Sequence, residues 1–195
     1  MKGCLEYNVK WIPGSELGRG FFGRVYELSN DGRYVMKLLK IEDQYDDDTG
    51  GHPGISVADF DQEIEMQNMF ATLGVAVPVV DSWMCNGEYG VIVMRRLSRT
   101  LKDYLEDHDD YDKDIIYKTL RRITEIHCRN FLSHGDYTLY NIMVDPNKYH
   151  PESVELNIDG DLVYLYLIDF GLAKKGQEYN KDIDLDYLDL IMKSL

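Results

Sequence analysis

The sequence has no long apolar run, few prolines and few basic residues, and each shortage excludes a class of protein. No apolar stretch approaches the roughly 18 residues of a membrane-spanning helix, and the first residues do not resemble a signal peptide. We therefore expect no membrane association. Only five prolines accompany a hydrophobic fraction of 44%, which excludes a disordered chain and indicates a globular protein. A length of 195 residues suffices for one domain or two small lobes.

Basic residues are outnumbered, with 21 lysines and arginines against 35 aspartates and glutamates, and the formal net charge is −14. Binding to a phosphate backbone relies on clustered lysine and arginine, so direct nucleic-acid binding is not expected. The charge is unevenly distributed, and residues 42–54 form an acidic, glycine-rich stretch that cannot bury enough apolar area to order itself. We interpret this stretch as an acidic surface loop inserted between two structural elements.

Cysteine is also scarce. The three cysteines, Cys4, Cys85 and Cys128, do not show the spacing of a metal site. An odd number of cysteines suits a reducing compartment, where thiols stay reduced. The sequence therefore predicts a cytoplasmic, intracellular protein.

Two short motifs carry the chemistry, residues 134–141 (HGDYTLYN) and residues 168–171 (IDFG). Asp136 and Asn141 lie five residues apart on a short loop, and Asp169 directly follows an apolar run that predicts a buried strand. Phosphoryl transfer from ATP needs such a set: one carboxylate orients the attacking hydroxyl, while an amide oxygen and a second carboxylate hold magnesium.

A glycine-rich motif, residues 18–25 (GRGFFGRV), lies near the N-terminus. Gly18, Gly20 and Gly23 permit a tight turn and let backbone N–H groups approach phosphate oxygens. A Rossmann fingerprint would require a helix after the last glycine. Residues 24–28 (RVYEL) are rich in strand formers and end at a turn, so the pattern favours strand, loop and strand.

Lys37 is the only charge inside the apolar core of the next predicted strand, residues 33–39. By itself it could be a lysine whose charged end reaches water. The following amphipathic helix, from Ser56 to about residue 73, offers Glu63 or Glu65 as a carboxylate partner. These glutamates point about 200° apart, so at most one faces the lysine. Glu63 neighbours the apolar side and is preferred. Ser56 is a plausible N-cap, with Asp59 as its capping partner.

Taken together and in this order, these motifs resemble the protein-kinase superfamily. The resemblance implies an α+β, two-lobed fold. Residues 1–94 would form the N-lobe, a five-stranded antiparallel sheet plus one helix, whose last two strands, 75–80 and 89–94, are joined by a turn at 86–87. Residues 95–195 would form the hinge and a shortened, mainly helical C-lobe, with helices at 101–106 and from residue 113 onward.

The resemblance also assigns roles. Lys37, held by Glu63, would contact the ATP phosphates, Asp136 would accept or orient the substrate hydroxyl, and Asn141 with Asp169 would hold Mg²⁺ or Mn²⁺. His134 would organise the loop rather than transfer protons. The ATP-binding residues would be the glycines of the loop with Val25, Val35, Lys37, Met94, Arg96 of the hinge and Met143.

The departures from the usual kinase pattern are informative. Gly135 replaces the arginine of His-Arg-Asp, which predicts activity without an activating phosphate, and Thr138 replaces a lysine. Only residues 172–195 follow the metal-binding motif, without an Ala-Pro-Glu sequence. These features are similar to the RIO kinases and the KEOPS-complex kinase, which implies a partner complex. By that resemblance Asp184 would anchor the catalytic loop, and otherwise it is a carboxylate favoured by a helix N-terminus.

The sequence thus predicts a serine/threonine protein kinase that uses ATP and phosphorylates a protein substrate, itself included. Two alternatives stay open. Small-molecule phosphotransferases of the aminoglycoside and choline type also use His-Gly-Asp with a downstream asparagine, although they usually carry a larger C-terminal lobe. A nucleotide-binding pseudokinase that acts as an interaction module is the other, although every catalytic position is present.

Overall fold

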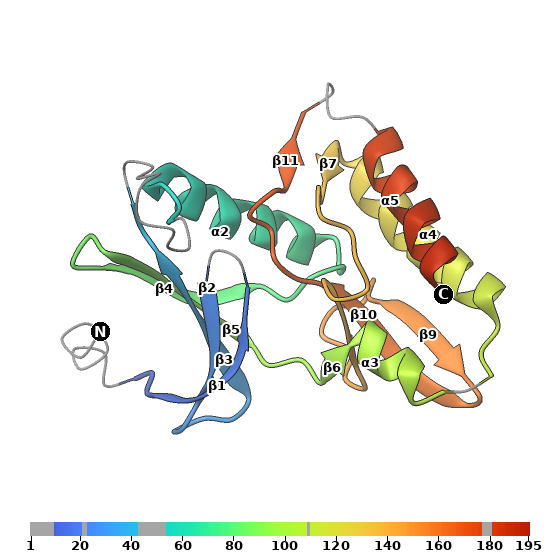
Figure 1. Ribbon diagram of the computed structural model, residues 1–195, viewed down its shortest axis with the longest axis horizontal. Helices are drawn as coiled ribbons and strands as arrows, with labels where there is room; N and C mark the ends of the chain where they lie inside the picture. Colours follow the sequence, from blue (N-terminus) through green and yellow to red (C-terminus); the bar gives the residue numbers. More distant parts are fainter. Residues whose placement is uncertain (1–9, 21–22, 43–53, 109, 177–180) are drawn as a thin grey trace. The chain divides into compact units, whose positions relative to one another are not determined.

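The computed structural model describes residues 10–20, 23–42, 54–108, 110–176 and 181–195, with only the backbone of 181–183. The chain divides into two compact units (Figure 1). The first unit comprises Met1–Ile64 and Val79–Arg96, and the second comprises Glu65–Pro78 and Leu97–Leu195. Most of the acidic stretch 42–54 lies outside the described residues.

The first unit contains a five-stranded antiparallel sheet, as the sequence predicted. Its order is β1-β2-β3-β5-β4. The strands are β1 (Pro13–Arg19), β2 (Gly23–Leu28), β3 (Tyr34–Lys40), β4 (Val79–Cys85) and β5 (Tyr89–Arg95). One face is apolar because Met36, Leu38, Val91 and Val93 alternate along β3 and β5 and pack with Trp11.

The turn between β4 and β5 follows from Asn86 and Gly87, whose φ angles are 51° and 73° and which lie inside a turn closed by the Glu88 amide donating to the Cys85 carbonyl at 2.9 Å. Strand β4 itself begins at Val79, so the predicted strand at 75–80 is wrong in its bounds. The preceding residues belong to the second unit, where Ala76 forms a β-bridge with Leu167. The apolar pattern of 75–80 therefore reflects burial in two places rather than one strand.

Helix α2 (Val57–Thr72) begins with the predicted capping pair. The Ser56 amide donates to Asp59 Oδ2 at 3.1 Å, and the Asp59 amide donates to Ser56 Oγ at 3.1 Å. The division between the two units falls inside this helix, after Ile64. In the first unit Phe60 lies so close to Gly90 of β5 that a Cβ there would meet its ring at 2.4 Å. This contact holds the start of the helix against the sheet.

The second unit contains three further helices: α3 (Leu101–Glu106), α4 (Lys113–Arg129) and α5 (Lys181–Ser194). Helices α4 and α5 run side by side (Figure 1). Helix α4 presents one stripe to the core, where Ile116, Leu120, Ile123 and His127 are all fully buried. The predicted spacing of four, three and four residues produces this stripe.

A four-stranded antiparallel sheet accompanies these helices, and most of it was not predicted. Its order is β6-β8-β10-β9, from β6 (Arg99–Thr100), β8 (Ile142–Asp145), β9 (Val154–Ile158) and β10 (Asp161–Leu167). Only β10 was expected, because its apolar run is long. Two short strands, β7 (Leu132–Ser133) and β11 (Lys174–Lys175), pair with each other in a separate two-stranded sheet. The C-terminal half is therefore less purely helical than the sequence indicated.

The structure bears on two expectations from the composition, those on membrane-spanning helices and on cysteines. No helix in the described ranges is long and apolar enough to cross a membrane. Cys85, at the end of β4, is disulfide-bonded, so the expectation of reduced thiols is wrong for this residue. An odd number of cysteines leaves at least one outside any disulfide, but it does not exclude a bridge.

Candidate active site

One buried carboxylate, that of Asp184, holds the loop between β7 and β8 in place. Asp184 of α5 accepts hydrogen bonds from the His134 amide at 2.8 Å and from the Gly135 amide at 3.1 Å. Its Oδ2 also lies 3.0 Å from His127 Nε2. Burial alone would raise the pKa of Asp184, but these hydrogen bonds outweigh it and hold the pKa below its usual value. Asp184 therefore anchors the loop, as the resemblance implied.

His134 organises the loop and is not exposed to solvent. Its Nε2 lies 3.0 Å from the carbonyl of Ile168, and the Asp136 amide donates to its Nδ1 at 3.4 Å. Burial and the neighbouring His127 lower the pKa of His134. A neutral ring with its proton on Nε2 satisfies both contacts. The structural role predicted for His134 agrees with this geometry.

Asp136 and Asn141 are joined directly. The Asn141 Nδ2 group donates to the Asp136 carbonyl at 2.9 Å and to Asp136 Oδ2 at 2.7 Å. The Asn141 amide meanwhile donates to Thr138 Oγ1 at 3.3 Å, which closes the loop into a turn. Because Asn141 Nδ2 donates to Asp136, the side-chain oxygen of Asn141 is directed away from these two hydrogen bonds. A carboxamide oxygen is a ligand type suited to Mg²⁺.

Asp169 adopts a left-handed backbone conformation with φ 65°, two residues after the end of β10. The next residue, Phe170, is fully buried, with ring centroids 4.9 Å from Phe70 and 5.2 Å from His134. The Ile168 amide donates to the Asn141 carbonyl at 3.0 Å. The surrounding packing thus holds an unfavourable conformation, which is a mark of functional sites. The two motifs meet in one site of the second unit.

An arginine could not replace Gly135 without movement of the backbone. Its φ is +77°, and a Cβ there would lie 2.5 Å from the Leu172 carbonyl oxygen. Both the conformation and the contact exclude a side chain. Leu172 directly follows the Asp-Phe-Gly motif, so the backbone of loop 134–141 runs close to that of this motif. This close approach could not be predicted from the sequence.

In the first unit, Lys37 and Glu63 form an ion pair with Nζ and Oε1 2.6 Å apart. Their side chains are 12% and 4% exposed. Glu65 lies on an exposed part of α2. Removing Lys37 would leave the Glu63 carboxylate buried without this cation, which is unfavourable.

The glycine-rich motif forms the ends of β1 and β2. The Gly20 amide donates to the Gly23 carbonyl at 2.9 Å, and a Cβ on Gly23 would meet the Leu38 carbonyl oxygen at 2.6 Å. Gly18 pairs with Val25, which in turn lies opposite Lys37 of β3. Residues 21–22, the tip of the motif, lie outside the described residues. The loop base and the lysine therefore share one part of the sheet.

The remaining predicted nucleotide-binding residues are distributed over both units. Met94 is buried and lies opposite Val35 of β3. The Arg96 amide donates to the Arg33 carbonyl at 2.9 Å, so this amide is already used within the first unit. Met143 lies in β8 of the second unit, opposite Tyr166. Their joint role in binding adenine stays a prediction.

The described residues contain another group of potential metal ligands, formed by His127, Cys128 and Asp184. Both oxygens of Asp184 already accept hydrogen bonds from the loop. We therefore assign this cluster to holding the loop in place.

A five-stranded antiparallel sheet with a lysine–glutamate pair, and an aspartate–asparagine loop joined to an Asp-Phe-Gly turn, define a protein kinase. The chain matches the protein kinase domain family over residues 11–189 and belongs to that family. It is similar to the "Probable serine/threonine-protein kinase FPV212" of Fowlpox virus (strain NVSL), with 27% identity over 187 residues. The match covers 88% of this chain and 55% of that relative, so the chain spans about half the relative's length.

Proposed function

We propose that this protein kinase transfers the γ-phosphoryl group of ATP to serine or threonine hydroxyls of protein, itself included. The observation that carries the proposal is the Asn141–Asp136 pair, held by a loop whose amides are fixed by Asp184. An intact pair of this kind supports catalysis rather than a scaffold role. The name of the fowlpox relative supports serine and threonine as acceptors.

Each side chain has a role that its surroundings support. Asp136 accepts or orients the proton of the attacking hydroxyl, and its position is set by Asn141. Asn141 and Asp169 supply a carboxamide and a carboxylate oxygen to Mg²⁺ or Mn²⁺, which neutralises phosphate charge when bound. Lys37 contacts the phosphates and is oriented by Glu63. The glycines Gly18, Gly20 and Gly23 contact the phosphates through backbone amides, and Val25, Val35, Met94, Arg96 and Met143 surround the adenine.

The protein is active without prior phosphorylation. In kinases that need an activating phosphate, an arginine of the catalytic loop reads it, whereas Gly135 has no room for any side chain. Control would then come from a partner complex, as the similarity to the KEOPS-complex kinase implies.

The test uses protein purified from a host without kinases, incubated with Mg²⁺, radiolabelled ATP, generic protein acceptors and a panel of amino alcohols and sugars. We expect phosphoserine and phosphothreonine on protein, and a loss of roughly 10²–10⁴-fold in rate for Asp136→Asn. Transfer confined to small alcohols would establish a small-molecule phosphotransferase. ATP binding without transfer to any acceptor would establish a pseudokinase.

A further inference from the structure

The loop 134–141 has a second attachment, which lies after Asp136 rather than before it. Asp184 of α5 accepts hydrogen bonds from the amides of the two residues that precede Asp136. Tyr137, the residue that follows, donates from its hydroxyl to the Leu120 carbonyl of α4 at 3.1 Å. Two different helices therefore hold the backbone on either side of the carboxylate on which the proposed reaction depends.

The second attachment is a small polar group inside an apolar core. Tyr137 belongs to the hydrophobic core of the second unit and is 1% exposed. Thr124 of α4, equally buried, donates from Oγ1 to the same Leu120 carbonyl at 3.1 Å. Burial raises the pKa of the Tyr137 phenol, and the neighbouring Thr124 hydroxyl offsets this effect only in part. The phenol therefore stays protonated at neutral pH and remains a donor.

The hydroxyl of Tyr137 is not needed to fill the core. In the usual His-Arg-Asp motif a leucine follows the aspartate, and leucine packs without any polar partner. A hydroxyl buried among apolar groups is unfavourable unless it is hydrogen-bonded, and the bond does little more than offset that cost. What the hydroxyl adds is direction, because a hydrogen bond weakens steeply with angle whereas apolar packing is non-directional.

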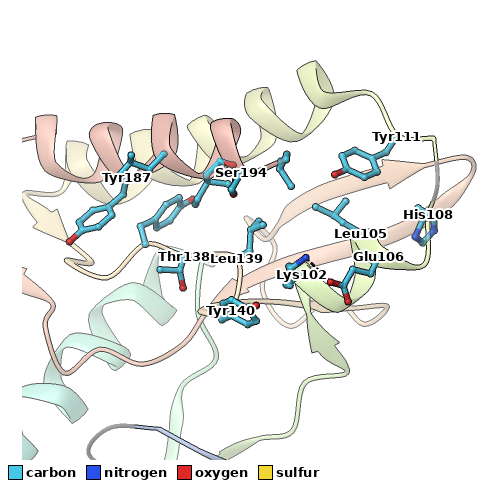
Figure 2. A pocket seen from close by; sticks show the side chains of 14 residues that line it. Lys102, Leu105, Glu106, His108, Tyr111, Thr138, Leu139, Tyr140, Tyr187 and Ser194 are labelled. Carbon is cyan, nitrogen blue, oxygen red and sulfur yellow. Dashed lines mark hydrogen bonds and ion pairs between the residues drawn. The ribbon is translucent and has the colours of Figure 1, made fainter.

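The loop also borders an open groove, so packing restrains it incompletely (Figure 2). This groove has a volume of about 750 Å³, and its walls are residues 137–140, helix α3 and the C-terminal half of α5. Figure 2 shows Thr138, Leu139 and Tyr140 beside this space, and Tyr140 is 63% exposed. A directional bond from the loop to α4 therefore opposes a movement that packing alone would permit.

We propose that Tyr137 and Thr124 are positioning residues for phosphoryl transfer, because their hydroxyls on the Leu120 carbonyl hold the backbone beside Asp136 in place. The proposal rests on the proposed function and deepens it. Both residues act through the position of the Asp136 carboxylate relative to the acceptor hydroxyl. A misplacement of about 1 Å in such a geometry costs up to about 10²-fold in rate, so the loss of one hydroxyl should cost about tenfold.

The test compares Tyr137→Phe with the matched control Tyr104→Phe, using ATP, Mg²⁺ and the generic protein acceptor that the wild type uses best. Tyr104 of α3 is also 1% exposed in the second unit, and its hydroxyl donates to Asp161 Oδ2 at 2.9 Å. Both changes thus remove one buried, hydrogen-bonded hydroxyl. Thr124→Val and its control Thr119→Val repeat the comparison on α4, where Thr119 Oγ1 donates to a carbonyl of the same helix at 2.8 Å.

We expect Tyr137→Phe and Thr124→Val each to lower kcat about tenfold, with unchanged KM for ATP and for the acceptor. Both control variants should keep the kcat of the wild type. The double variant should lose little more than Tyr137→Phe alone, because the two hydroxyls share one carbonyl. Tyr104→Phe should lower the melting temperature at least as much as Tyr137→Phe, since its lost hydrogen bond is to a carboxylate.

An unchanged kcat in Tyr137→Phe, or an equal fall in Tyr104→Phe, would overturn the positioning role and leave the proposed function standing. A raised KM with unchanged kcat would assign the hydroxyl to binding and overturn it as well. Should Tyr137→Phe not fold, the comparison of Thr124→Val with Thr119→Val decides by the same criteria. Absence of phosphoryl transfer by the wild type to every protein would instead refute the proposed function.

Discussion

At the scale of single residues, a comparison of two glycines distinguishes the cost of a strained backbone conformation from the cost of a steric clash. Gly135 and Gly160 both have positive φ angles, +77° and +90°. A Cβ on Gly160 meets nothing within 4 Å, whereas a Cβ on Gly135 meets the Leu172 carbonyl oxygen at 2.5 Å. The Gly160→Ala change therefore costs only the left-handed conformation, about 1–2 kcal/mol. Gly135→Ala adds the displacement of a carbonyl beside the metal loop.

We expect Gly135→Ala to lower the free energy of unfolding by more than Gly160→Ala and to lower kcat as well. Denaturant titration and steady-state phosphorylation measure the two effects. Equal losses of stability in both variants, with kcat unchanged, would show that Leu172 yields easily and that the contact does not position the site.

The lysine–glutamate pair is the second prediction at this scale. Lys37→Met removes the cation proposed to contact the phosphates, and we expect a loss of about 10²–10³-fold in kcat. Glu63→Gln should weaken transfer by roughly tenfold or more because the lysine loses its orienting charge. Glu65→Gln, an exposed change two residues along the same helix, is the matched control. Greater damage from Glu65→Gln than from Glu63→Gln would contradict the assignment.

At the scale of elements, helix α5 acts as the support of the catalytic loop. Asp184 fixes two loop amides and His127, while Asp189 on the same helix is exposed. Asp184→Asn keeps the shape but turns charge-assisted hydrogen bonds into neutral ones and leaves an amide nitrogen facing donors. We expect a loss of about 3 kcal/mol in unfolding free energy and a lower kcat. Thermal unfolding and kinetics of Asp184→Asn and Asp189→Asn should differ sharply, and similar behaviour of the two would refute the anchoring role.

The elements that the sequence predicted are those whose signal is local. Helix α4 has a long apolar stripe, α2 has its capping pair, and the β4–β5 turn has Asn86-Gly87. Strand β9 was missed although its signal is local, since its residues alternate between buried and exposed and the two-residue turn Asp159-Gly160 joins it to β10. Strand β8 was missed because four residues carry too little periodicity and its partner β10 is distant in the sequence. The shifted start of β4 has the same cause, since Ala76 is buried by Leu167 rather than by its neighbours in sequence.

The candidate site likewise contains residues that the sequence identified and contacts that only the fold creates. Lys37, Asp136, Asn141 and Asp169 were selected from residue type, spacing and the resemblance to protein kinases. The structure joins Asp136 to Asn141 and pairs Lys37 with Glu63, and the roles of all four in the reaction stay predictions. The contact between Gly135 and Leu172 could not be predicted, because it depends on the backbone path after the Asp-Phe-Gly motif. The groove beside the loop was also missed, since its lining comes from three segments that only the fold brings together.

At the scale of the whole molecule, stability should depend on pH through a buried histidine. Burial lowers the pKa of His134 in the folded protein below its ordinary value of 6.5. As the pH falls below about 6.5, the unfolded chain binds a proton that the folded protein does not bind. The unfolding free energy should then decrease by up to about 1.4 kcal/mol per pH unit until His134 itself is protonated.

Denaturant midpoints between neutral and mildly acidic pH test this expectation, with His134→Gln as the comparison because glutamine does not titrate. The variant should show a shallower decrease over the same range. Effects of the overall net charge are common to both proteins and cancel in the difference. Parallel curves for the wild type and His134→Gln would show that His134 does not control the decrease in stability between neutral and mildly acidic pH.

Asp184 acts over a lower pH range. Its pKa is depressed, so its contribution to stability is present above about pH 4 and is lost as the pH falls further.

Binding of nucleotide with metal should stabilise the folded protein, since a ligand that binds only the folded state raises the unfolding free energy by mass action. At a ligand concentration of about a hundred times Kd this gain is about 2.7 kcal/mol, which a thermal unfolding experiment resolves. We expect the gain with ATP and Mg²⁺ together, and a much smaller one with ATP plus excess chelator. Asp169→Ala removes a proposed metal ligand but keeps a Cβ in the left-handed conformation, so the unliganded variant should stay folded, with a melting temperature lowered only by the small extra cost of alanine at this φ angle. It should nevertheless lose the metal-dependent gain and all phosphoryl transfer. If Asp169 were instead only a turn residue, its replacement would lower the melting temperature and leave the metal-dependent gain intact, so the two roles give opposite results in a single measurement.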